Sequence, residues 1–421
     1  MAVQLISIAV VVVSNILLTW WLGDVIFARY SFVISWVQLL TNIALFGLQD
    51  YVLKELGVLA MQPTDRPLAV SLVRQVLGNS LLMACLLAFL LVAAAFSLQN
   101  GQLHENRYAI LVGAPTILLF VYIFQLQAIV RTWRTAVWSL LSEKLVRPFF
   151  VCLVAGFFFS IKQSPTVVAG VGWATLCTLL AAVFSTFVLF YKTNLTPHDI
   201  WRKPEKKFQI NRKEQLDFLL LSIIGIAYIR IDTLFLGELG YIDDVGVYNV
   251  ATRFTDLIGF AMQTLSFVLT ATYALYYKNK EFTNLQTLVT QSNRIIFAIT
   301  VPLFIAIVVF GKFFLGIHSE GFIRGYPVVL VLGSVQLISA FCGDNNAILA
   351  MCGYGRQAFW CLLCGFSVAV VLEIILIPHY GMWGAVLGRG IGSVIMYLGC
   401  ALMLWYKTGL KPTILGLTFR N

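Results

Sequence analysis

The sequence predicts an all-α polytopic membrane protein, with twelve transmembrane helices in two pseudo-symmetric six-helix lobes around a central cavity. The 421 residues are 60% hydrophobic and only 11% charged, and the mean hydropathy is +0.87. Apolar stretches of about 20 residues, long enough to cross a bilayer as a helix, recur along the whole chain. Short matching motifs occur in the two halves of the sequence. A soluble domain cannot bury so much apolar side chain, so the bilayer is the expected solvent.

Counting the apolar stretches gives six on each side of one long polar interruption. The predicted spans cover residues 3–22, 30–51, 72–97, 108–130, 137–161, 166–191, 216–236, 246–277, 295–317, 326–352, 357–377 and 382–406. The interruption is basic and covers residues 192–215. We therefore expect an N-terminal lobe at residues 1–191, a cytoplasmic linker at 192–215 and a C-terminal lobe at 216–421.

The basic residues predict the orientation of the chain in the membrane. If the N-terminus is cytoplasmic, 21 of the 29 Lys and Arg residues fall in cytoplasmic loops and in the C-terminal tail. The opposite side then holds Arg29, Arg107, Lys162, Lys312 and Arg324, and three more Arg residues lie within spans. Cytoplasmic loops of membrane proteins carry such an excess of positive charge. Both termini are therefore expected in the cytoplasm.

Composition also excludes several classes of function. The net charge of +10 would suit nucleic acid, but its one-sided distribution fits membrane topology better, so no nucleic-acid partner is expected. All eight cysteines lie in apolar segments, which is typical of small core residues and not of disulfides. Cys361 and Cys364 form a C-x-x-C pair, but no second pair or His cluster accompanies it. We expect no metal site and no cofactor other than a coupling proton or sodium ion.

The two halves carry similar motifs at equivalent places. Leu22-Gly23-Asp24 precedes the second span, and Leu236-Gly237-Glu238 precedes the eighth span. Because each half has an even number of spans, the repeat would be parallel, related by an axis along the membrane normal. Transporters built in this way bind substrate near the bilayer midplane, between the halves.

Four charged residues lie inside the seventh and eighth predicted spans: Arg230, Asp232, Arg253 and Asp256. A charge near the bilayer centre costs from about 3 to more than 10 kcal/mol, so it rarely faces lipid. We interpret these residues as lining a substrate cavity.

Four stretches of the chain resemble the polysaccharide exporters of the multidrug/oligosaccharidyl-lipid/polysaccharide (MOP) flippase superfamily, in particular the Wzx-type O-antigen flippases. They are LGDVIFARYSF with NIALFGLQDYVLKE, IRIDTLFLG with DDVGVYNVATRF, EGFIRGYPVVLVLG with NNAILAMCGYGRQ, and IPHYGMWGAVLGRGIGSV. The resemblance implies translocation of an undecaprenyl-diphosphate-linked oligosaccharide, for O-antigen or a related surface polysaccharide, to the outer leaflet by alternating access. It also implies a bacterial inner-membrane location, the lipid-linked oligosaccharide and the bilayer as partners, and contact with a glycan polymerase and a chain-length regulator.

The eighth span has the clearest polar face. Asn249, Thr252, Arg253, Asp256 and Gln263 follow helical spacing along it. A polar stripe on an apolar helix is best satisfied by a wet cavity, so Asn249 and Arg253 are candidate substrate-binding residues. The alternative is that the Arg and Asp three residues apart simply pair with each other.

Two further arginines are candidate cations for a substrate phosphate. Arg230 and Asp232 are two residues apart and point to opposite sides of a helix, so each needs a partner elsewhere. A guanidinium binds phosphate oxygens in a bidentate fork, and this suits Arg230. The alternative is an ion pair between two helices. Arg389 is a third candidate; Gly388, Gly390 and Gly392 beside it indicate close helix packing.

Neutral polar residues on two other spans suit sugar hydroxyls, which both donate and accept hydrogen bonds. The second span carries Gln38, Thr41, Asn42 and Gln49, and the tenth carries Gln336, Ser339, Gly343 and Asn346. Of these, Gln38, Asn42 and Asn346 are the candidate ligands. The alternative role is hydrogen bonding between helices.

Carboxylates inside the spans are candidates for carrying a coupling proton or ion. They are Asp232, Asp256, Glu373 and Asp344. Burial disfavours a charged carboxylate, so a change of protonation would favour one arrangement of the lobes. For Glu373 the alternative is a place near the outer interface.

Other functions remain as alternatives. A cation-coupled multidrug exporter fits the number of spans, but such exporters usually keep key charges in the first half, which is nearly uncharged here. A lipid II flippase usually has two more spans. A membrane glycan polymerase needs a large outer loop or an acidic motif, and Asp243-Asp244 is only a turn pair. With no catalytic constellation in the sequence, we expect a transporter and not an enzyme.

Overall fold

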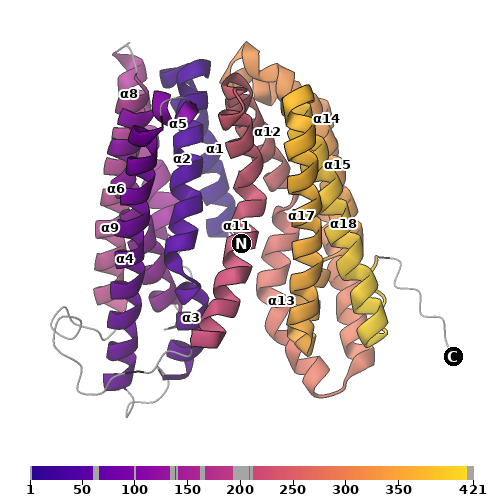
Figure 1. Cartoon of the computed structure of the whole chain (residues 1–421). Coiled ribbons are helices and arrows are strands. Elements are labelled where there is room, and N and C mark those ends of the chain that lie inside the picture. Colours follow the sequence, from indigo (N-terminus) through magenta and orange to yellow (C-terminus); the bar gives the residue numbers. More distant parts are fainter. Residues whose placement is uncertain are drawn as a thin grey trace. The chain divides into compact units, whose positions relative to one another are not determined.

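The computed structural model describes residues 2–59, 66–98, 101–132, 138, 141–161, 166–192, 208 and 212–414. Within these ranges the regular structure is helical throughout, as Figure 1 shows. The chain divides into two compact units, Met1–Arg230 and Ile231–Asn421, and each is described by itself. The division falls inside one helix, α11 (Arg212–Glu238). The predicted linker lies largely outside the described residues.

Unit 1 contains long helices that run alongside one another (Figure 1). In chain order they are α1 (Ala2–Leu22), α2 (Asp24–Leu45), α3 (Leu48–Leu59), α4 (Arg66–Ser97), the short α5 (Gln102–Glu105), α6 (Arg107–Thr132), a π-helical turn (Ser142–Val146), α8 (Arg147–Ser160), α9 (Val167–Lys192) and most of α11. Helix α6 packs against α2, α3, α4 and α9, while α1 packs against α8. A core cluster joins α3, α4, α6 and α9.

Unit 2 repeats this all-helical arrangement. Its elements are the end of α11, α12 (Ile242–Ile258), α13 (Phe260–Lys278), α14 (Phe282–His318), a 3₁₀ helix (Glu320–Gly325), α15 (Tyr326–Cys342), the short α16 (Asn345–Leu349), a π-helical turn (Ala350–Tyr354), α17 (Gly355–Tyr380) and α18 (Met382–Thr408). Helices α17 and α18 pack along their length, and α15 packs against α12, α14 and α18. A core cluster joins α13, α14, α16, α17 and α18.

Each of the twelve predicted spans coincides with one to three consecutive helical elements, although the fifth span begins outside the described residues. The second, eighth and tenth spans are each broken into separate helices: α2 and α3, α12 and α13, α15 and α16. Within the described residues, six helical segments are long and apolar enough to cross a membrane. Large apolar side chains on helix surfaces, such as Phe89 on α4 and Leu402 on α18, are exposed. The chain is a multi-pass membrane protein.

Glycines allow two of these breaks. Phe46 and Gly47 both have positive φ angles (52° and 67°), which ends α2. A Cβ on Gly47 would lie 2.4 Å from the backbone nitrogen of Leu219 on α11, so only glycine fits. Gly343 (φ 79°) ends α15, and a Cβ there would lie 2.0 Å from Oδ1 of Asn293. The backbone can therefore turn at Gly47 and Gly343, because neither residue has a Cβ that would clash with Leu219 or Asn293.

Candidate functional site

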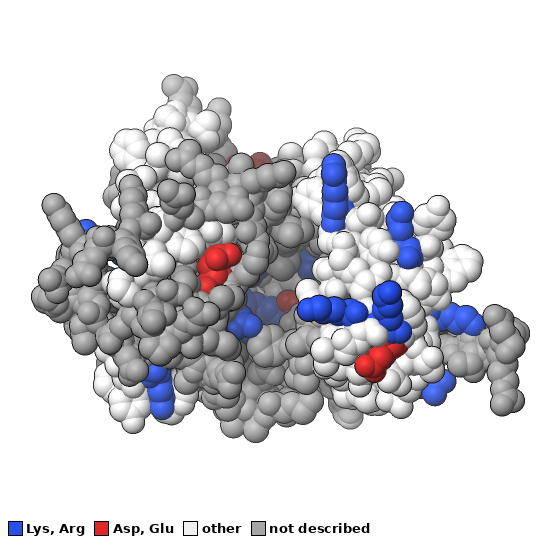
Figure 2. Space-filling view, turned by 90° about the horizontal axis from the view of Figure 1, so that it is seen from below, with Lys and Arg blue, Asp and Glu red and all other residues white. Residues whose placement is uncertain are grey.

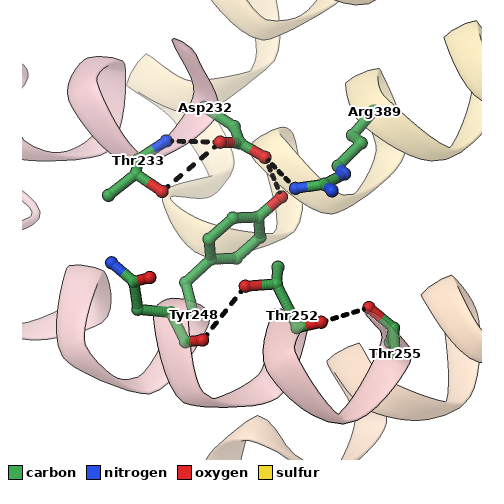
Figure 3. A network of polar contacts seen from close by, with 7 residues as sticks. Asp232, Thr233, Tyr248, Thr252, Thr255 and Arg389 are labelled. Atoms are coloured by element: carbon green, nitrogen blue, oxygen red, sulfur yellow. Dashed lines mark hydrogen bonds and ion pairs between the residues drawn. The ribbon is translucent and has the colours of Figure 1, made fainter. Parts of the chain in front are cut away.

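A buried polar network lies within unit 2, where α11, α12 and α18 meet (Figure 3). Asp232 on α11 is fully buried. Its Oδ2 accepts a hydrogen bond from the Tyr248 hydroxyl at 2.5 Å and forms an ion pair with Arg389 Nη1 at 2.8 Å. Its Oδ1 accepts a bond from the backbone N–H of Thr233 at 2.7 Å. Asp232 thus joins three helices through one carboxylate.

Glu373 on α17 lies beside this network. It is 1% exposed, and it is close enough to Asp232 and Arg389 to interact with both electrostatically. Within the described part of the chain, its Oε2 is buried and has no hydrogen-bond partner. A Cβ on Gly388 would lie 2.6 Å from Cγ of Glu373, so the glycine makes room for this side chain. Arg389 therefore forms an ion pair with Asp232 and lies within electrostatic range of Glu373.

The polar stripe of the eighth predicted span lies mostly on α12. Asn249 and Thr252 are buried, Arg253 is half-buried, and Asp256 and Gln263 are exposed. The exposed Asp256 is also within electrostatic range of Arg389. The stripe thus begins in the core beside the buried network and reaches the surface of unit 2 over two helical turns.

Helix α15 meets this stripe where α12 ends. A Cβ on Gly259 would lie 3.2 Å from Oε1 of Gln336, so the Gln336 amide fills the space at the α12–α13 junction. Further along, the Ser339 hydroxyl contacts Met262 Sδ at 3.3 Å. Three polar or polarisable groups of α15 and α13 therefore extend the stripe.

The break after α15 brings together a second group of polar side chains. Asp344 accepts hydrogen bonds from the Ser266 hydroxyl and from the backbone N–H of Ala347, and so caps the N-terminus of α16. The Asn345 and Asn293 side-chain amides both donate to the backbone carbonyl of Cys342, at 2.8 and 3.4 Å. Broken helices of this kind mark ligand sites in transporters.

The other predicted residues lie in different places. Asn346 is exposed, next to the buried Asn345. Gln38 and Asn42 are half-buried on α2 of unit 1, and the Asn42 amide donates to the Gln38 backbone carbonyl at 2.9 Å. Arg230 is half-buried at the last position of unit 1. Their roles in binding stay predictions.

Sequence reasoning missed Tyr248, Ser266 and Asn293. Tyr248 does not follow the polar spacing that selected its neighbour Asn249. The signal that could have found it is that a Tyr inside a membrane span usually donates a hydrogen bond. Ser266 and Asn293 make their contacts with residues 78 and 49 positions away, so no local spacing reveals them.

The comparisons with known proteins agree with this architecture. The family model described as "Polysaccharide biosynthesis protein" matches residues 1–260. A comparison with curated proteins found no match. Among solved structures, an inward-facing multidrug resistance MATE family transporter of the MOP superfamily has a TM-score of 0.73, with 17% identity over 96% of this chain and 95% of that chain.

Two further structures share the fold. The lipid II flippase MurJ in an inward closed conformation has a TM-score of 0.68, with 13% identity over 96% of this chain and 86% of that chain. A MOP superfamily transporter from Pyrococcus furiosus has a TM-score of 0.69, with 18% identity over 97% of this chain and 95% of that one. The fold is that of MOP-superfamily transporters. With more than half of its length matched by the family model, the chain belongs to the polysaccharide biosynthesis protein family of exporters and flippases.

Proposed function

We propose that this transporter-type flippase moves an undecaprenyl-diphosphate-linked oligosaccharide, for O-antigen or a related surface polysaccharide, from the cytoplasmic to the outer leaflet of a bacterial inner membrane. The family match over residues 1–260 supports the polysaccharide class of substrate. The observation that carries the proposal is Arg253, a half-buried guanidinium on the polar stripe of α12. A fixed cation at such a position suits an anionic group that enters a cavity.

In this proposal Arg253 and Arg230 bind the diphosphate or an acidic sugar. The amides of Asn249, Asn346, Gln38 and Asn42 would bind sugar hydroxyls. The polyprenyl chain stays in the bilayer, and the two units alternate between inward-open and outward-open arrangements. Arg389 has a defined partner in Asp232, so for this residue the structural evidence supports positioning more directly than substrate contact.

The first experiment is complementation of a deletion strain. Arg253→Ala should lower surface polymer about tenfold or more, because a charge-assisted hydrogen bond contributes roughly 1.5–3 kcal/mol. Complete single repeat units on undecaprenyl diphosphate should accumulate, measured by mass spectrometry of extracted lipids. Arg324→Ala is the matched control, because Arg324 is exposed at one end of unit 2 and pairs with Asp244.

Protein levels are checked by immunoblotting. Normal export by both Arg230→Ala and Arg253→Ala would contradict a role of these two cations in binding the substrate. An unchanged lipid profile in the deletion strain would favour a drug exporter, and exported single units that are not polymerised would favour a polymerase.

A second experiment tests proton coupling with Glu373→Gln in the same strains. An amide cannot take up the proton, so unchanged transport by this variant would show that Glu373 does not carry the coupling proton.

A further inference from the structure

An apolar groove lies between α15 and α18 on unit 2, with a cavity volume of about 440 Å³. Its walls are made by Leu337, Ile338 and Phe341 of α15, and by Leu398, Leu402 and Trp405 of α18. Three of these side chains, Leu398, Leu402 and Trp405, are about half exposed or more. The groove is therefore open, and its chemistry suits a hydrocarbon chain.

The groove does not face Gln336 on α15 or Arg389 on α18. At 3.6 residues per turn, Leu337, Ile338 and Phe341 lie about 100–200° around α15 from Gln336. On α18, Leu398 and Trp405 lie about 160–180° around the helix from Arg389. Gln336 beside the polar stripe and Arg389 in the buried network thus lie on other faces of these helices than the groove. The geometry points to a lipid of the surrounding bilayer and not to the transported molecule.

The segment that follows α18 closes one end of the groove. Pro412 and Thr413 line it there. Lys411 exchanges two backbone hydrogen bonds with the Gln286 side chain, at 2.7 and 3.1 Å. The backbone N–H of Ile414 donates to the Phe341 carbonyl at 3.3 Å. These contacts tie the segment to α14 and α15, so the closed end is a fixed part of unit 2.

Cations gather at this closed end. Lys411 directly precedes Pro412, which lines the groove. Arg294 is exposed on α14 and donates from Nε to the Ile414 carbonyl at 3.2 Å. Figure 2 shows Lys and Arg side chains spread over the described surface of this end of unit 2. An apolar groove that ends at basic residues is complementary to a lipid with a negative headgroup.

We propose that the α15–α18 groove binds an anionic phospholipid of the bilayer, with one acyl chain along α15 and α18 and the phosphate beside Arg294 and Lys411. Trp405 has the amphipathic ring that is typical of the membrane interface, which places the phosphate and the indole at similar depth. This site is independent of the transport function proposed above, and its test does not require transport.

The test uses the full chain purified in detergent. Phosphatidylglycerol and phosphatidylcholine with the same acyl chains are titrated, and binding is followed by native mass spectrometry and by the midpoint of thermal unfolding. Phosphatidylglycerol should bind at least tenfold more tightly. Arg294→Gln with Lys411→Gln should weaken it about fivefold for each cation removed, given the usual contribution of a cation at an anionic surface.

Two matched controls separate the groove from general effects. Lys278→Gln with Lys280→Gln removes the same charge at the α13–α14 turn and should leave the affinity unchanged. Ile338→Trp fills the groove and should weaken binding, whereas Ile374→Trp, at an exposed position of α17, should not. The Arg294/Lys411 variant and its Lys278/Lys280 control keep the test decisive if Ile338→Trp does not fold.

Equal binding of the two phospholipids would overturn the proposal, and so would equal effects of the Arg294/Lys411 and Lys278/Lys280 variants. Undecaprenyl phosphate is the competing probe. If it displaces phosphatidylglycerol at equal concentration, and Ile338→Trp abolishes binding of both, the groove belongs to the polyprenyl lipid and the proposal fails.

Discussion

Asp232 is the residue on which the polar core of unit 2 depends. It is fully buried, and its carboxylate receives a guanidinium, a phenol and a backbone N–H. A buried ion pair contributes little net stability, because desolvation of both groups offsets their attraction. Removing one partner is different, since it leaves an uncompensated charge in an apolar environment. The pair therefore fixes how α11 and α18 pack more than it adds to stability.

A double-mutant cycle tests this. Asp232→Asn and Arg389→Gln should each lower the free energy of unfolding by about 3–5 kcal/mol, because each leaves one buried charge without its partner. The double variant should lose less than the sum of the two, since neither of the two replaced side chains then carries a charge that needs its partner. Thermal unfolding in detergent measures all three. Strictly additive losses would show that the two groups do not act as a pair. Tyr248→Phe is the control, which removes one neutral donor and should cost about 1–3 kcal/mol.

At the scale of elements, small residues decide how closely α17 and α18 approach. A Cβ on Gly392 would lie 2.6 Å from the Gly365 carbonyl oxygen, and a Cβ on Gly384 would lie 2.5 Å from the Ile377 nitrogen. The sequence prediction of close packing is confirmed for Gly388 and Gly392, whereas Gly390 has room for a methyl group. In a membrane, where lipid is as apolar as the helix surface, such contact between backbones is a main source of helix association.

Gly392→Ala should therefore lower the thermal unfolding midpoint of the detergent-purified chain by several degrees, with a cost of about 1–3 kcal/mol from overpacking. Gly390→Ala, two residues away on α18, is the matched control. Its Cβ would lie 3.6 Å from Val335 Cγ2, an ordinary contact, and alanine favours the helix by about 1 kcal/mol. Equal midpoints for the two variants would argue against close packing as the cause.

At the scale of the whole molecule, the distribution of charge predicts orientation. On the side expected outside, Arg29 pairs with Glu105 in unit 1 at 3.6 Å, and Arg324 pairs with Asp244 in unit 2 at 3.3 Å. These pairs reduce the net charge of that side. The end of unit 2 with the α13–α14 turn carries Lys and Arg over its described surface (Figure 2). This asymmetry is expected when that end faces the cytoplasm.

Two reporter fusions test the orientation. Alkaline phosphatase joined after Gly240, between α11 and α12, should be active, because the enzyme folds only outside the cytoplasm. The same reporter joined after Asn279, between α13 and α14, should be inactive. A fluorescent protein joined to Asn421 should fluoresce if the C-terminus is cytoplasmic. Reversed activities at Gly240 and Asn279 would contradict the predicted topology.

The sequence by itself determined the helical spans, the six-plus-six arrangement and the class of protein. These follow from local properties: a bilayer requires about 20 apolar residues per span, and buried charges are rare enough to be conspicuous. It also identified Asp232, Glu373 and Arg389 as individual residues. The tertiary structure alone decided that they lie together, 16 to 157 positions apart in the chain, and that Tyr248 completes the group. Such partners depend on how whole helices pack, because the 3.6-residue period determines only which side chains share a helix face.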